Sequence, residues 1–126
     1  MIHYKVINRK NPLDRTLPEK HYATVVKNGT VDFESLADII TDSSTVSMGD
    51  ILNVLQMLEK AVVRELGQGR IVQLGRLGNF QVGISSKGVD TPEEVNAELI
   101  TKARIIFRLG RKMRHLVDNV KYQKAS

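Results

Sequence analysis

The chain of 126 residues has an ordinary globular composition, with 41% apolar and 26% charged residues and a formal net charge of +5, and its length suits one domain. The absence of Cys excludes disulfides, thiol catalysis and zinc sites built on cysteine. No apolar run reaches the roughly 18 residues of a membrane span, and residues 1–20 lack the apolar core of a signal peptide, so we expect a cytoplasmic protein without a membrane partner.

Residues 1–29 predict an N-terminal β extension. Segments 2–8 and 21–27 are typical of short strands, and the segment between them contains Asn11-Pro12 and Leu17-Pro18, which oppose helix. The tip of this strand pair is cationic, which is compatible either with simple solvation or with contact to nucleic acid. Its cations are Arg9, Lys10 and Arg15.

Two amphipathic helices are predicted next. Asp32 can cap a helix whose apolar residues follow helical spacing as far as Ile40. Ser47 begins a second capping pattern, and the helix after it is predicted over Gly49 to Leu66. Because the apolar face of this second helix is wider than one neighbouring helix needs, we expect a dimer whose second subunit covers the surplus. A central helix buried within a monomer is the alternative.

A β-hairpin and an excursion follow the second helix. Glycines 67 and 69 end the helix, Arg70 to Leu74 predicts a strand, and Phe80, Val82 and Ile84 alternate on the next strand. Thr91-Pro92-Glu93-Glu94 is a further capping pattern with proline at the first helical position, which predicts one or two helical turns ending near residue 100.

Residues 102–114 predict a cationic strand that leads into a helix. If Ala103, Ile105 and Phe107 face a core, the period of two places the cations together on the other face. The helix is predicted over Arg111 to Val120, and Gln123 to Ser126 are expected to fray. A charged strand is often only a solvated outer face, but a row of cations also suits a polyanion. The three cations are Lys102, Arg104 and Arg108.

Charge is segregated along the sequence. Residues 101–126 contain eight Lys or Arg against the single acid Asp118, whereas residues 31–66 contain seven Asp or Glu against Lys60 and Arg64. Such a separation favours a polyanion-binding face over a generally charged surface.

Motifs that would carry enzyme chemistry are missing from the sequence. His3, His21 and His115 lack metal-ligand spacing, and no histidine lies near Ser85-Ser86 to activate a nucleophile. The glycines of 75–78 match the G-x-x-G loop of KH domains, but that loop requires flanking helices and strands are predicted here. We therefore expect no enzyme activity, no cofactor, no metal and no small-molecule substrate.

Two segments resemble the HU/IHF family of bacterial histone-like DNA-binding proteins. Residues 66–80, L-G-Q-G-R-I-V-Q-L-G-R-L-G-N-F, are similar to the family segment in which a helix end and a glycine lead to V-Q-L and then G-F-G-T-F. Residues 104–117, R-I-I-F-R-L-G-R-K-M-R-H-L-V, resemble its strand-to-helix segment. The resemblance implies an α+β fold with two N-terminal helices, an antiparallel sheet with an arm and a short C-terminal helix. It implies an HU-like domain over residues 30–122, after the extension and before a tail at 123–126.

The resemblance also implies an intertwined homodimer that binds double-stranded DNA with low sequence specificity, mainly through phosphate and minor-groove contacts, and is associated with the nucleoid. Bending of the DNA would follow from a two-sided grip. The sequence departs from the family at the arm tip, where S-S-K-G-V-D-T-P-E-E-V replaces the Arg-Asn-Pro motif whose proline wedges between base pairs. The residues expected to contact DNA are Arg70, Arg76, Lys87, Lys102, Arg104, Arg108, Arg111 and Arg114.

A second hypothesis follows from the altered arm. An HU-like assembly or regulatory module that has lost DNA binding could use the same cations for an acidic protein partner. The N-terminal extension resembles that of a longer HU-related subgroup. The sequence does not indicate which molecule or segment this extension contacts.

Overall fold

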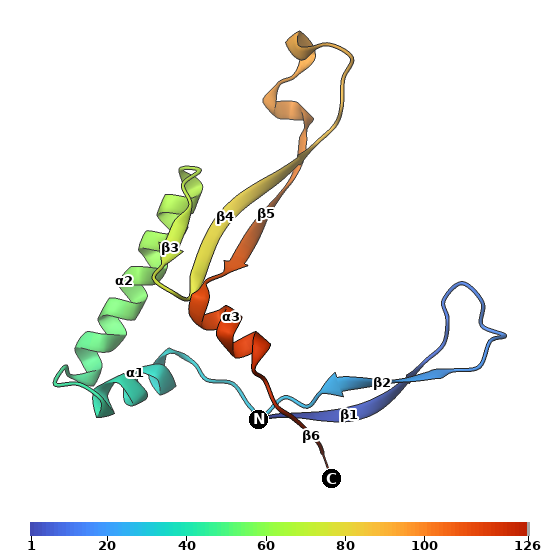
Figure 1. The fold of residues 1–126 in the computed structure, drawn as a ribbon. Helices are drawn as coiled ribbons and strands as arrows, with labels where there is room; N and C mark the ends of the chain where they lie inside the picture. The colour runs from blue at the N-terminus through green and yellow to red at the C-terminus, as the bar shows by residue number, and fades with distance from the viewer. Residues whose placement is uncertain (126) are drawn as a thin grey trace. The chain divides into compact units, whose positions relative to one another are not determined.

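The computed structural model describes residues 1–125 and has the α+β class expected from the sequence (Figure 1). The chain forms two compact units, one made of residues 1–30 with the segment from Leu116 onward, and one made of Val31–His115. The elements in chain order are β1 (Ile2–Arg9), β2 (Lys20–Val25), α1 (Phe33–Asp42), α2 (Met48–Gly67), β3 (Val72–Leu74), β4 (Gly78–Ser86), η1 (Pro92–Glu94), η2 (Ala97–Leu99), β5 (Ile100–Leu109), α3 (Arg111–Asp118) and β6 (Tyr122–Lys124).

The first unit is built on a three-stranded sheet in the order β2-β1-β6. Strands β1 and β2 are antiparallel, as the expected strand pair requires, and β6 pairs with β1 in parallel. The N–H of Ile2 donates to the carbonyl of Lys121 at 2.8 Å, and the N–H of Ala125 donates to the carbonyl of Tyr4 at 2.8 Å. Fraying of Gln123 and Lys124 was therefore a wrong expectation, because both are paired in β6. Ser126 lies outside the described residues.

In the second unit, both helices begin at the residues that the capping patterns indicate. The Asp32 carboxylate accepts from the N–H of Ser35 at 2.9 Å, and this hydrogen bond is the main cause of the lowered pKa of Asp32. The Ser47 hydroxyl accepts from the N–H of Asp50 at 3.3 Å. A free backbone donor is satisfied at each helix start, which explains why these helices begin where they do.

Strands β3, β4 and β5 form the sheet of the second unit, and all its pairs are antiparallel. Phe80 on β4 lies opposite Phe107 on β5, with ring centroids 4.8 Å apart in a tilted arrangement. Val82 lies opposite Ile105 and therefore shares the same face. The alternation that the sequence predicts for both strands is confirmed by this register.

The segment between β4 and β5 forms an arm that extends beyond the paired strands (Figure 1). We expected helical turns here, and the structure has the two short 3₁₀ turns η1 and η2. Proline is at the start of η1 as predicted, but the Thr91 hydroxyl donates to the Glu94 carboxylate at 2.9 Å and caps no backbone N–H. The ladder shifts by a residue at Ser85/Ser86, and the N–H of Lys87 donates to Leu99 at 2.9 Å.

The described chain buries few apolar side chains. Ala37, Ile51 and Leu66 are the buried hydrophobic residues of the described part, while Val54 and Val63 on α2 remain 62% and 66% exposed. The chain exposes 10911 Å² of solvent-accessible surface, whereas two separate compact domains of the sizes of these units would expose about 8,000 Å² together. A single copy therefore leaves much of its apolar surface in contact with water.

No helix within residues 1–125 has the length and apolar character needed to cross a membrane.

Candidate nucleic-acid interface

The register of β4 with β5 places three cations on one face of the sheet. Residues directly opposite one another in an antiparallel pair point to the same side. Lys102 lies opposite Ser85, Arg104 opposite Gly83 and Arg108 opposite Asn79. The alternation of the strands adds Gln81 and Ile106 to this face, which we call the cationic face of β4–β5. It contains three cations and no acid. Its members are Asn79, Gln81, Gly83, Ser85, Lys102, Arg104, Ile106 and Arg108.

Arg104 lies across its partner strand. Its Nη1 donates to the Ser85 hydroxyl at 3.2 Å. A Cβ built on Gly83 would lie 3.1 Å from the Arg104 Cζ, which places the guanidinium directly over this glycine. A guanidinium has five N–H donors, so the bond to Ser85 holds the group in place and leaves donors for a phosphate.

The cations of this face lack acidic partners. The ion pairs found within residues 1–125 join Lys10 to Glu19 and join Arg64 and Arg70 to Glu65. Lys102, Arg104 and Arg108 take part in none of these pairs, and all three residues are exposed. Exposed cations without an acidic partner attract a polyanion.

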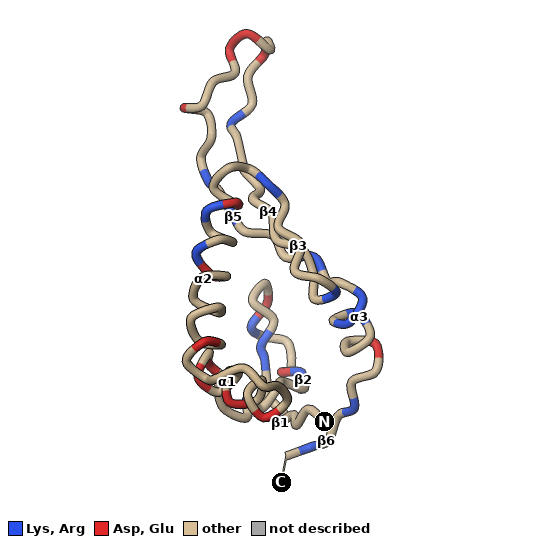
Figure 2. Tube along the Cα trace, turned by 90° about the vertical axis from the view of Figure 1, so that its left-hand side faces the viewer, with Lys and Arg blue, Asp and Glu red and all other residues tan. Residues whose placement is uncertain are grey.

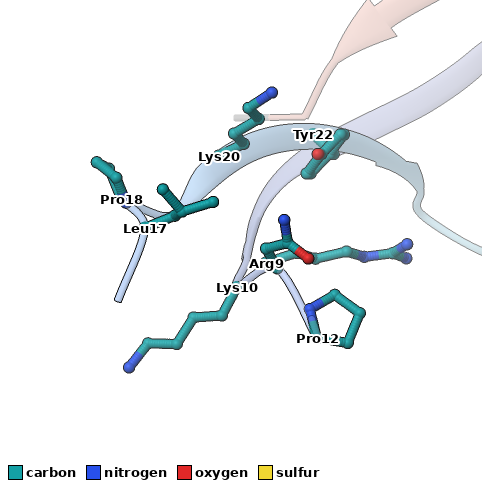
Figure 3. A pocket seen from close by; sticks show the side chains of 8 residues that line it. Arg9, Lys10, Pro12, Leu17, Pro18, Lys20 and Tyr22 are labelled. Atoms are coloured by element: carbon teal, nitrogen blue, oxygen red, sulfur yellow. The ribbon is translucent and has the colours of Figure 1, made fainter. Parts of the chain in front are cut away.

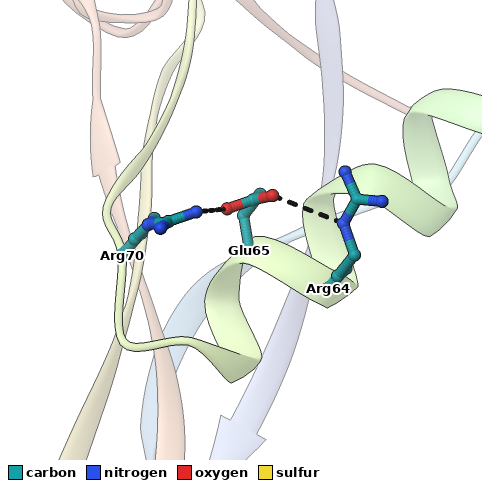
Figure 4. A network of polar contacts seen from close by, with 3 residues as sticks. All are labelled: Arg64, Glu65 and Arg70. Atoms are coloured by element: carbon teal, nitrogen blue, oxygen red, sulfur yellow. Dashed lines mark hydrogen bonds and ion pairs between the residues drawn. The ribbon is translucent and has the colours of Figure 1, made fainter.

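Arg70 differs from the β5 cations because it is already paired. Its Nη1 donates to the Glu65 carboxylate at 2.5 Å, and Arg64 Nε donates to the other oxygen of the same group at 3.3 Å (Figure 4). The hydrogen bond from Arg70 is the largest cause of the lowered pKa of Glu65. Part of the charge of Arg70 is therefore compensated within the chain.

Arg76 lies in the turn between β3 and β4, next to the start of α3. The N–H of Lys112 donates to the Arg76 carbonyl at 3.0 Å, and the N–H of Gly110 donates to Leu77 at 2.8 Å. A pocket of about 450 Å³ is formed at this junction, and both Arg76 and Lys112 line it. Lys112 was not among the expected DNA contacts. Its place in the sequence, next to the expected contact Arg111, was a signal that could have added it as a candidate.

The remaining expected contacts are distributed over the second unit. Arg111 and Arg114 lie on α3, and Lys87 lies at the base of the arm beyond the irregularity in β4. All eight expected residues are exposed. Figure 2 shows that acidic residues gather on α1 and at the tip of the arm. The structure thus brings Lys102, Arg104 and Arg108 onto one face and leaves the other five at separate positions.

Within the described residues, no three His, Asp or Glu side chains are close enough together to hold a metal ion.

Two capped helices, a sheet extended into a β-arm and a basic strand followed by a short helix define an HU-like domain. A family model named HU-HIG, described as "HU domain fused to wHTH, Ig, or Glycine-rich motif", matches residues 1–124. The chain belongs to this family. The matched range includes β1 and β2 of the N-terminal extension.

A solved structure shares the fold at low sequence identity. It is the crystal structure of a "putative bacterial DNA binding protein" from Bacteroides vulgatus ATCC 8482, with a TM-score of 0.66 and 13% identity. The alignment covers 98% of this chain and 47% of that one, so the present chain spans about half the length of the protein it resembles. A comparison with curated proteins finds no matching sequence.

Proposed function

We propose that the chain is an architectural DNA-binding protein that binds duplex DNA as a homodimer with little dependence on base sequence. The observation that carries this proposal is the cationic face of β4–β5, where three cations without an ion-pair partner among residues 1–125 lie together and no acid lies among them. Membership of an HU-like family and the fold shared with a candidate DNA-binding protein point the same way.

The contacts in this proposal are mainly to phosphate. Lys102, Arg104 and Arg108 form the floor of the interface, and their side chains displace condensed counterions from the duplex. The other proposed contacts extend this floor toward the turn, α3 and the arm. They are Arg70, Arg76, Lys87, Arg111 and Arg114, to which we add Lys112.

Dimerisation is proposed because a single copy leaves many large apolar side chains exposed to water. On α2 the side chains of Val54, Met57 and Leu58 are spaced as one stripe and are 62%, 56% and 43% exposed. A second copy that covers such stripes would complete the hydrophobic core. Two copies would also present two cationic faces of β4–β5. Contacts to the duplex from both of these faces favour bending of the DNA, because the bend permits additional contacts.

The arm is not proposed to wedge between base pairs. Its tip contains the four acids Asp90, Glu93, Glu94 and Glu98, which phosphates repel, and it lacks the Arg-Asn-Pro motif. The same acidic tip supports the second candidate, an HU-like assembly module with a protein partner. A protein that binds DNA in this way belongs at the nucleoid.

Duplex binding is tested directly by fluorescence anisotropy with two random-sequence duplexes of equal length. We expect equal affinity for the two sequences and a steep loss of affinity as salt rises from 50 to about 200 mM. Absence of binding to both duplexes at the lower salt concentration would contradict the proposal and favour the assembly module.

A further inference from the structure

The N-terminal extension is a second cationic segment of the chain, beside the C-terminal segment 101–126. Residues 1–30 contain six Lys or Arg and two acids, Asp14 and Glu19, so this segment has a net charge of +4. The duplex interface proposed above uses none of these cations. The extension therefore has an electrostatic role that the cationic face of β4–β5 does not explain.

The register of β1 with β2 sorts the extension into two faces. Arg9 lies opposite Lys20, and Ile7 lies opposite Tyr22, so these four side chains share one face. The other face has Tyr4 opposite Val25 and Val6 opposite Ala23, and the polar pair of Asn8 and His21 nearest the loop. The cations are thus placed together beside an exposed aromatic ring.

These residues line a pocket at the loop end of the hairpin, with a volume of about 380 Å³ (Figure 3). The Arg9 guanidinium carbon lies 5.9 Å from the centroid of the Tyr22 ring, a cation–π distance that orients the guanidinium. Tyr22 is 46% exposed and Leu17 is 47% exposed. One part of the lining is cationic and the other is aromatic and apolar. The lining residues are Arg9, Lys10, Asn11, Pro12, Leu17, Pro18, Lys20 and Tyr22.

The cations of the pocket are largely uncompensated. Lys10 is 4.0 Å from Glu19, while Arg9 and Lys20 belong to none of the ion pairs found within residues 1–125. The loop is also held in shape, since the Asn11 side chain accepts from the N–H of Leu13 at 2.9 Å and the Asp14 carboxylate accepts from the N–H of Thr16 at 3.0 Å. A fixed pocket with free cations requires little reorganisation to accept an anion.

We propose that this pocket binds a nucleotide unit of an unpaired nucleic-acid strand, independently of the duplex interface. Arg9, Lys10 and Lys20 hold the phosphate, and the base lies against the aromatic and apolar wall formed by Tyr22 and Leu17. A duplex would offer only its phosphates, because its bases are stacked inside and cannot reach such a wall. A free nucleotide would gain one set of contacts in an exposed pocket, whereas a strand adds contacts from neighbouring phosphates.

Anisotropy with a labelled single-stranded oligonucleotide tests the proposal on the whole chain. Tyr22→Leu should weaken single-strand binding at least about fivefold, as expected when a base no longer stacks on an aromatic ring, and Tyr22→Phe should retain it. Arg9→Ala/Lys20→Ala should lower the slope of log affinity against log salt by about 0.7 for each phosphate that is no longer neutralised. Lys27→Ala/Lys121→Ala removes the same charge from positions outside the pocket and should have a much smaller effect.

The pocket variants should leave duplex binding through the cationic face of β4–β5 unchanged, and a circular dichroism spectrum matching that of the unaltered chain checks that each variant folds. Equal single-strand affinity for Arg9→Ala/Lys20→Ala and its charge-matched control would overturn the proposal, as would a mononucleotide that binds as tightly as the oligonucleotide. If the unaltered chain binds no duplex but single-strand binding disappears in the pocket variants, the proposed duplex function fails and this inference stands.

Discussion

Gly110 lies where β5 ends and α3 begins, and the backbone of the β3–β4 turn passes directly against it. A Cβ at this position would lie 2.5 Å from the Arg76 carbonyl oxygen and 2.8 Å from the Leu77 carbonyl carbon. Neither atom belongs to a flexible side chain, so an added methyl group must displace backbone. The contact explains why the strand-to-helix junction requires glycine and how Arg76 is positioned beside α3.

Gly110→Ala should therefore lower the free energy of unfolding by about 1–3 kcal/mol, the usual cost of inserting an atom into packed structure. Urea unfolding at a fixed protein concentration measures the effect. Gly49→Ala is the matched control, because a Cβ on this helical glycine meets nothing within 4 Å and alanine favours helix. Equal stability of the two variants would show that the junction tolerates a side chain.

At the scale of elements, the exposed stripe on α2 is the feature that a single chain leaves unexplained. Val54 and Leu58 are one helical turn apart and are 62% and 43% exposed. Burial of these side chains against a second copy would stabilise each protomer, since burial of an apolar side chain contributes about 1.5–3 kcal/mol.

Light scattering coupled to size exclusion should give twice the chain mass of 14.1 kDa for the unaltered protein. Val54→Glu/Leu58→Glu should shift the protein to monomer or to unfolded chain, because it places charge in an apolar interface. Gln56→Glu adds charge on another side of α2 and should leave the dimer intact. A mass of one chain at all concentrations would rule the dimer out.

The sequence predicted most elements of the fold because their signals are local. Asp32 and Ser47 cap their helices, and the period of two in β5 indicated which side chains share a face. Strand β6 was missed because its pairing with β1 joins opposite ends of the chain and its three residues show no apolar alternation. At the arm tip, where helical turns were expected, the structure has two 3₁₀ segments of three residues each, a length typical of this helix type.

For the interface, sequence reasoning placed Lys102, Arg104 and Arg108 together, and the register of β4–β5 supports that grouping. For Arg9, the sequence indicated only that it is one of several cations at the tip of a strand pair. Arg9 lies opposite Lys20 because of the register between β1 and β2. No local sequence pattern specifies this register, since a long loop separates the two strands. The pocket beside Tyr22 was therefore not predictable from the order of residues.

At the scale of the whole molecule, acidic and basic residues are concentrated in different elements. Helix α1 contains three acids and no cation, whereas β5 contains three cations and no acid. Each of the two units also has a surface with cations that form no ion pair within residues 1–125. They are Lys102, Arg104 and Arg108 on the sheet of β4–β5, and Arg9 and Lys20 at the hairpin of β1–β2. In the proposed binding modes, these cations attract a polyanion and the acids of α1 repel it.

The proposal that the cationic face of β4–β5 binds duplex DNA is tested most directly with the double variant Arg104→Ala/Arg108→Ala. The measurement is the salt dependence of its affinity for a duplex. We expect the slope of log affinity against log salt to fall by about 0.9 for each phosphate that the variant no longer neutralises, together with weaker binding. Lys60→Ala/Arg64→Ala, which removes two cations from α2, should keep the slope of the unaltered protein. A slope that is the same for Arg104→Ala/Arg108→Ala as for the unaltered protein would contradict binding through the cationic face of β4–β5.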